Sequence, residues 1–277
     1  MTEGDFQRAI RQRFVMLDQM RSTSPQVFMP SGDSELALDD EYWIPQPLSQ
    51  SAYRAFIVAL DHLQAIRVHL DRPYPVLFPF AHLSLCRPAL ISSSLAVWLL
   101  APTEQQERVR RHYISIADEL RNHERYLREL TKLDLNDEST VGVLQHVRVR
   151  LSEVDTKLGV TSQADWNKVR VSTTAQINVA ADVLGASFVR NGRYDDDPLE
   201  LANEIKLSWQ ATSGAAHGLT WQINGTPSIE QSGEADEHGR ATFVAGGSFG
   251  QLANHYCAAV EMAHLSWSLL KQRGNYT

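Results

Sequence analysis

Apolar residues recur every three or four positions along most of this chain, which is the spacing of one face of an α-helix. The pattern predicts a helix at the N-terminus, a second over about 51–70 and a last one over about 249–271. Repeated prolines interrupt it over residues 23–48. Because proline lacks a backbone donor and restricts the residue before it, this segment is expected to be an extended arm, held to the body by Tyr42 and Trp43.

The most apolar stretch of the chain covers residues 80–101. Arg87, Pro88 and a run of serines interrupt it, so its unbroken apolar part is shorter than the roughly 20 residues that a bilayer requires. We therefore expect a buried central helix rather than a membrane span. Pro88 fits such a helix if it lies in the first turn, where its missing N–H is not needed.

Two long apolar seams follow each other in the middle of the chain. Thr103 is expected to open a helix, with Gln106 as its capping-box partner, and a heptad-like seam runs from Val109 to Leu130 and includes His123. After a polar turn at 134–140, a second seam runs from Leu144 to Leu158. These two helices are expected to pack as an antiparallel hairpin.

The C-terminal half continues the helical pattern, with one interruption. Residues 173–188 predict a helix and residues 191–197 a loop; Pro198 then opens a helix that Gly218 should end. Residues 221–223 and 241–244 suggest two short strands. The fold class expected is mainly all-α: a helical bundle with a long antiparallel helical hairpin and a small β-hairpin before the last helix. Residues 1–48 would form a helix and arm, and residues 49–277 the bundle, with an insert at about 219–245.

Composition narrows the classes of function. The chain has 277 residues, of which 43% are hydrophobic and 21% charged, and 26 basic minus 33 acidic residues give a net charge of −7. This balance disfavours non-specific binding to nucleic acid or to a membrane surface. The two cysteines, Cys86 and Cys257, cannot form a disulfide scaffold, and the first residues lack an apolar signal core. We expect a cytoplasmic protein.

The string Gly246-Gly-Ser-Phe-Gly250 matches the G-x-S-x-G pattern of a hydrolase nucleophile elbow. Such a hydrolase needs a large parallel sheet and an acid and a histidine after the serine, whereas only one helix follows here. The pattern favours a turn in which Ser248 caps the last helix. An anion site at this glycine-rich helix N-terminus stays open as an alternative.

Histidines and acids offer two metal hypotheses. Glu261 and His264 have the Glu-x-x-His spacing of di-iron bundles, but that chemistry needs a second such pair, which the chain lacks. A mononuclear site stays open among four scattered histidines: His62, His69, His123 and His264. Because histidines more often pack or lie at the surface, we expect neither a metal nor a cofactor.

Basic residues gather over 107–132, which could indicate a nucleic-acid groove. Acidic residues alternate with them, however, and mixed signs on a long helix usually form exposed i,i+4 pairs.

Trp209, Ser213 and His217 lie on one i,i+4 ridge at the end of a predicted helix. A histidine at a helix C-terminus gains from the helix dipole, so His217 is either a cap or a member of a pocket.

The segment from Arg87 to Pro102, the basic string 107–111 and the later Ser-x-x-x-His-Gly of Ser213–Gly218 resemble helical proteins of the HEPN (higher eukaryote and prokaryote nucleotide-binding) superfamily, in an uncharacterised actinobacterial group. The resemblance implies a helical core and, for many members, ribonuclease activity in toxin–antitoxin or defence systems. The chain departs from the family's pattern in one respect. Catalytic members carry an arginine shortly before the histidine, whereas no arginine of this chain stands five to seven positions before any histidine. Arg87 would have to supply that cation from another helix.

Two hypotheses follow. The first is a non-catalytic HEPN-like binding protein that acts through a protein partner or a small ligand, as a monomer or a homo-oligomer. The second is a ribonuclease or nucleotide-directed enzyme, with His217 as general acid or base, Ser213 orienting it and Arg87 stabilising phosphate charge. The absent arginine and the acidic net charge favour the first. RNA is therefore a less favoured partner, and no membrane is expected.

Overall fold

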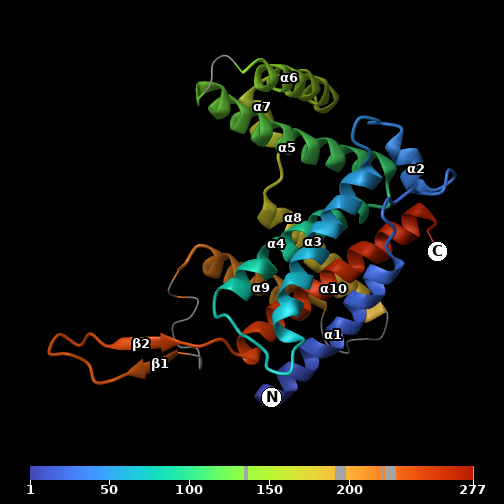
Figure 1. The fold of residues 1–277 in the computed structure, drawn as a ribbon. Helices are drawn as coiled ribbons and strands as arrows, with labels where there is room; N and C mark the ends of the chain where they lie inside the picture. The colour runs from blue at the N-terminus through green and yellow to red at the C-terminus, as the bar shows by residue number, and fades with distance from the viewer. Residues whose placement is uncertain (134–136, 191–197, 220, 222–228, 277) are drawn as a thin grey trace. The chain divides into compact units, whose positions relative to one another are not determined.

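The computed structural model describes residues 1–133, 137–190, 198–219, 221 and 229–276. Within these residues the fold is almost entirely α-helical, with one two-stranded antiparallel sheet, which confirms the predicted fold class (Figure 1). The chain divides into two compact units at different places from those expected: residues 1–101 with 174–277, and residues 102–173. The N-terminal helix and arm thus belong to the first unit, and the helical hairpin forms the second.

The first unit is built around its last helix, α10 (Phe249–Gly274). The long helices α1 (Glu3–Thr23), α3 (Leu48–Leu70), α4 (Ala81–Leu100) and α9 (Pro198–Ala216) pack against α10 (Figure 1). The α3 helix also packs against α4. Aromatic rings fill one end of this core, where the Phe56 and Trp267 rings stack with their centroids 5.1 Å apart.

The proline-containing arm is more ordered than its sequence predicts. It contains a short helix, α2 (Glu35–Asp40), and it buries Phe28 against Trp267. Of the two residues expected to hold the arm, Trp43 is buried, but Tyr42 is 49% exposed and so does not anchor it as predicted. Phe28 has the anchoring role instead, because an aromatic ring buried in the core outweighs one lying at the surface.

The apolar segment forms α4, and most of its residues are buried in the first unit, as expected for a central helix. Within the described residues, α4 is the one helix long and apolar enough to span a membrane. Pro88 does not lie in the first turn, as was predicted, but inside the helix, because α4 begins at Ala81. The helix tolerates the proline because the packing of α4 against α3 and α10 compensates for one missing backbone hydrogen bond.

The second unit consists of α5 (Gln105–Leu133), α6 (Glu138–Leu158) and α7 (Gln163–Val169). The first two form the predicted antiparallel hairpin, held by a small apolar cluster that includes Leu127, Leu144 and Val147. Two details differ from prediction. Thr103 does not cap α5, because the first backbone hydrogen bonds of this helix go to the carbonyl of Glu104. His123, which was expected in the apolar seam, is exposed.

The remaining helix of the first unit, α8 (Thr173–Arg190), lies where a helix was expected. Gly218, with φ +67°, follows the end of α9 as predicted. The hairpin pairs β1 (Ile229–Ser232) with β2 (Thr242–Ala245), so the first strand lies after the segment 221–223 that was expected to form it. The predicted loop 191–197 and most of that expected strand lie outside the described residues.

Candidate functional site

The three site residues predicted from sequence lie on two helices of the first unit. Arg87 is half-buried on α4, Ser213 is half-buried near the end of α9, and His217 is exposed just beyond it. The backbone N–H of His217 donates to the carbonyl of Ser213 at 3.1 Å, which extends the last turn of the helix. Among the described residues, no side-chain hydrogen bond or ion pair joins Arg87 to Ser213 or His217. The ribonuclease hypothesis built on these residues stays a prediction.

The glycine-rich N-terminus of α10 carries an anion from its own chain. The carboxylate of Glu3 accepts hydrogen bonds from the backbone N–H groups of Phe249 at 2.5 Å and Gly250 at 3.2 Å. Ser248 caps the same helix, since its hydroxyl accepts from the N–H of Gln251. The predicted cap is therefore confirmed, and the place where an external anion would bind is taken by Glu3.

Neither metal hypothesis finds support, because the described residues contain no group of three or more His, Cys, Asp or Glu side chains that could hold a metal ion. Of the histidines considered, His69 pairs instead with His82, at 3.2 Å between Nδ1 and Nε2. The backbone N–H of Phe78 donates to the other ring nitrogen of His82, which makes that nitrogen an acceptor. Burial lowers the pKa of His82 to about 4, so the imidazole of His82 is neutral near pH 7.

The first unit has a cavity of about 750 Å³ among α1, α8, α9 and α10. Its wall is mostly apolar, and the nonpolar side chains that line it are Leu184, Phe188, Leu201, Ile205, Leu207, Ala211, Trp221 and Ala258. This volume falls in the range of sites that hold small organic molecules, and such sites combine apolar walls with a few polar groups.

The polar side of this cavity is built around an ion pair. Arg13 on α1 and Glu261 on α10 approach to 3.1 Å, and the Glu261 side chain is buried. The Nε atom of Arg13 is buried and has no hydrogen-bond partner among the residues that the structure describes. A buried donor without a partner is costly, and it is common at sites that a polar group completes on binding.

His255 and Cys257 line the same cavity from α10. Burial lowers the pKa of His255 to about 4, so its imidazole is neutral near pH 7, and its Nδ1 atom is buried without a partner. Burial also raises the pKa of the Cys257 thiol. Both groups are therefore held uncharged, as the low polarity of the cavity wall requires.

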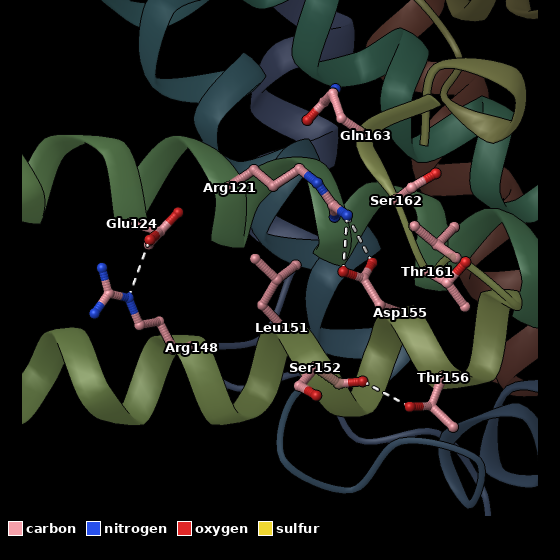
Figure 2. Close-up of a pocket in the computed structure, with 11 residues that line it drawn as sticks. Arg121, Glu124, Arg148, Leu151, Ser152, Asp155, Thr156, Thr161, Ser162 and Gln163 are labelled. Carbon is pink, nitrogen blue, oxygen red and sulfur yellow. Dashed lines mark hydrogen bonds and ion pairs between the residues drawn. The ribbon is translucent and has the colours of Figure 1, made fainter. Parts of the chain in front are cut away.

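The second unit has a smaller and more open cavity of about 440 Å³, lined mainly by polar side chains (Figure 2). Arg121 on α5 and Asp155 on α6 point toward each other across it and form two hydrogen bonds of 2.7 and 2.8 Å. The Arg121 guanidinium also lies 4.1 Å from the centre of the Trp166 ring, and Arg148 pairs with Glu124. These arginines pair across the hairpin, between α5 and α6, whereas the predicted i,i+4 pairing along α5 is seen between Arg111 and Glu107 at 2.9 Å.

No protein-family model, curated protein or solved structure gives a significant match to this chain.

The cavity of the first unit is therefore the best-formed candidate site in the described residues, and the sequence did not indicate it. Its walls come from four helices, of which α1 is far from the other three in the chain, and Arg13 lies in a helix whose pattern shows only an apolar stripe. The one signal was Glu261, which the Glu-x-x-His spacing had marked for metal binding. Its carboxylate serves an ion pair instead.

Proposed function

We propose that this chain is a non-catalytic binding protein that holds a small, largely apolar molecule in the cavity among α1, α8, α9 and α10. The observation that carries the proposal is the cavity itself: about 750 Å³, with apolar walls and a buried ion pair at one side. A HEPN-like core and a cytoplasmic location belong to the same proposal and rest on the sequence alone.

The chemistry of the cavity wall supports binding over catalysis. Thiolate, not thiol, is the nucleophilic form of cysteine, and burial keeps Cys257 in the thiol form by raising its pKa. His255 is neutral near pH 7, but its buried Nδ1 has no hydrogen-bond partner in the described part of the chain that it could activate. A general base acts through a hydrogen bond to the group it deprotonates. The wall thus offers apolar area and hydrogen-bonding groups rather than an activated nucleophile.

The test uses a neutral fluorophore, N-phenyl-1-naphthylamine, whose emission rises in apolar surroundings. We expect saturable binding by the wild type and its loss in Ala211→Trp, which places an indole in the cavity wall. Ala186→Trp is the matched control, because Ala186 is exposed on α8 and does not line the cavity. Circular dichroism of each variant shows whether the fold is kept.

Cys257 gives a second readout that needs no cavity-filling variant. Cys86 is fully buried, whereas Cys257 lines the cavity, so slow alkylation by iodoacetamide should modify Cys257 first. We expect the fluorophore to slow this reaction in the wild type, and Cys257→Ala identifies the modified site. Absence of saturable binding, or equal binding by Ala211→Trp and wild type, would overturn the proposal.

A further inference from the structure

Three polar side chains lie together in the wall of the cavity of the first unit. Arg13 on α1 and Glu261 on α10 form the ion pair of 3.1 Å, which joins Nη2 to Oε1. Cys257 lies one turn before Glu261 on α10. Burial raises the pKa of its thiol most, Arg13 lowers it and Glu261 raises it, so both charges act on this sulfur from nearby. Arg13, Cys257 and Glu261 thus form one polar corner of a mostly apolar cavity.

The guanidinium of Arg13 has more donors than the described residues use. A guanidinium carries several N–H donors and no acceptor, and its Nε–H and one N–H of Nη2 point the same way along one edge. Glu261 contacts Nη2 on this edge, whereas the buried Nε has no partner in the described part of the chain. The Arg13 side chain is 26% exposed and lines the cavity, so a bound molecule can reach the guanidinium. The corner therefore lacks an acceptor.

The charges of the corner favour a neutral acceptor over an anionic one. Arg13 carries one positive charge, Glu261 one negative charge and the Cys257 thiol none, so the corner is neutral as a whole. A carboxylate bound at Arg13 would lie beside the carboxylate of Glu261, with one cation between them, and like charges that share a buried site repel each other. An ammonium group would bring further donors and no acceptor. A carbonyl oxygen accepts a hydrogen bond and adds no charge.

We propose that the molecule bound in this cavity is a neutral apolar carbonyl compound, a ketone, ester or amide, whose oxygen accepts a hydrogen bond from the guanidinium of Arg13. This inference rests on the proposed binding function and adds the chemical class of the ligand. A hydrogen bond from a charged donor is stronger than one between neutral groups, so this contact would fix the orientation of the ligand. The apolar body of the ligand would lie against the side chains of α8 and α9, among them Phe188 and Ile205.

The test compares three competitors that share one apolar body. The ketone 2-acetylnaphthalene, the hydrocarbon 2-ethylnaphthalene and the anion 2-naphthoate each compete with bound N-phenyl-1-naphthylamine. In the wild type we expect 2-naphthoate to need a concentration about tenfold higher than the ketone, because the carboxylate of Glu261 opposes it. The hydrocarbon differs from the ketone in hydrophobicity as well, so the ratio of their affinities is compared between wild type and variants.

The double variant Arg13→Met/Glu261→Met removes the donor without leaving a buried charge unpaired, a replacement that folded proteins often tolerate. It should lower the affinity for the ketone, relative to that for the hydrocarbon, by about tenfold, since a hydrogen bond to a charged group is lost. Arg11→Met is the control, because Arg11 is exposed on α1 and does not line the cavity, and it should leave the ratio unchanged.

Glu261→Gln tests the charge argument separately. It keeps Arg13 but removes the carboxylate that opposes an anion, so 2-naphthoate should gain affinity by about tenfold relative to the ketone. Infrared spectroscopy of bound 2-acetylnaphthalene gives a readout that does not depend on affinity. Its carbonyl stretch should lie at a lower frequency in the wild type than in hexane, and should return toward the hexane value in Arg13→Met/Glu261→Met.

The outcomes separate this inference from the proposed function. If the neutral fluorophore does not bind to the wild type, the binding function itself is wrong. If it binds but 2-naphthoate competes as well as the ketone does, or the double variant keeps both the affinity ratio and the carbonyl frequency of the wild type, the binding function stands and the assignment of a neutral carbonyl ligand is overturned.

Discussion

Arg273 ties together segments that are far apart in the sequence, and its removal should destabilise the first unit strongly. Its side chain lies in the last turn of α10 and is only 9% exposed. The Nε atom donates to the carbonyl of Leu100 at 2.5 Å, Nη2 lies 3.4 Å from the carbonyl of Ala101, and Nη1 pairs with Glu35. The last carbonyls of a helix have no partner within it, so Arg273 caps the C-terminus of α4 with a positive charge.

Arg273→Met keeps the length and apolar stem of the side chain but removes these donors. A hydrogen bond to a charged group contributes about 1.5–3 kcal/mol, and two buried carbonyls would also lose a donor, so we expect a loss of about 3 kcal/mol. For a domain of this size each kcal/mol lowers Tm by about 2–4 °C, which gives a decrease of about 6–12 °C. Calorimetry and urea denaturation followed by tryptophan fluorescence measure the loss.

Glu35→Gln is the control that separates helix capping from ion pairing. The Glu35 carboxylate is 54% exposed, and exposed ion pairs contribute at most about 1 kcal/mol, so this variant should be nearly as stable as the wild type. A loss of stability equal to that of Arg273→Met would show that the ion pair, not the cap, carries the energy. A stable Arg273→Met variant would refute the reasoning altogether.

Further predictions concern the start of α10, acid stability, the core and the predicted ribonuclease site. Glu3→Gln should lower the free energy of unfolding by about 1–2 kcal/mol, because the helix dipole stabilises a carboxylate at the N-terminus of α10. The difference between variant and wild type should be smaller in high salt, and a difference that does not depend on salt would contradict this. Burial holds the pKa of His82 and His255 at about 4, below the ordinary value of 6.5, so the unfolded chain binds more protons between these values. The free energy of unfolding should therefore fall as the pH is lowered from about 6.5 to about 4. This dependence on pH should be weaker in His82→Asn or His255→Asn than in the wild type. The same dependence in variant and wild type would show that these histidines do not cause it. Trp98→Ala should cost about 3–5 kcal/mol or give insoluble protein, because this ring is buried in α4; an unchanged Tm would contradict it. If His217 only caps α9, His217→Ala should lower stability by no more than about 1–2 kcal/mol and leave function intact, and an RNA-cleavage assay of wild type and variant shows whether the ribonuclease hypothesis holds.

The sequence predicts the helices well wherever one face of a helix meets the core. The seams from Val109 to Leu130 and from Leu144 to Leu158 become α5 and α6, paired as expected. The predictions failed where tertiary packing overrides a local signal. Pro88 lies inside a helix because α4 is packed on several sides, and His123 is exposed although it falls at a seam position of α5.

The candidate site was beyond the reach of local patterns for a physical reason. A cavity is made by side chains from helices that the chain brings together only on folding, and Arg13 and Glu261 are separated by almost the whole sequence. Motifs read locally pointed instead to Ser248 and to the Glu261–His264 spacing, whose residues have capping and ion-pairing roles. The acidic composition disfavours a surface for nucleic acid, and that expectation stays a prediction.

The two walls of the cavity differ in how firmly they are fixed. Helix α10 is held at its start by Glu3 and at its end by the contacts of Arg273 and by the Ser31 N–H, which donates to the carbonyl of Gly274 at 2.9 Å. The wall that carries Glu261 is therefore set by the same interactions that stabilise the fold. Glu204, in contrast, is exposed and has no partner among the described residues, so its replacement should leave the stability of the unit unchanged. Stability and binding would then depend on different residues. Measuring the free energy of unfolding and the binding of the fluorophore for both Arg273→Met and Ala211→Trp tests that separation directly.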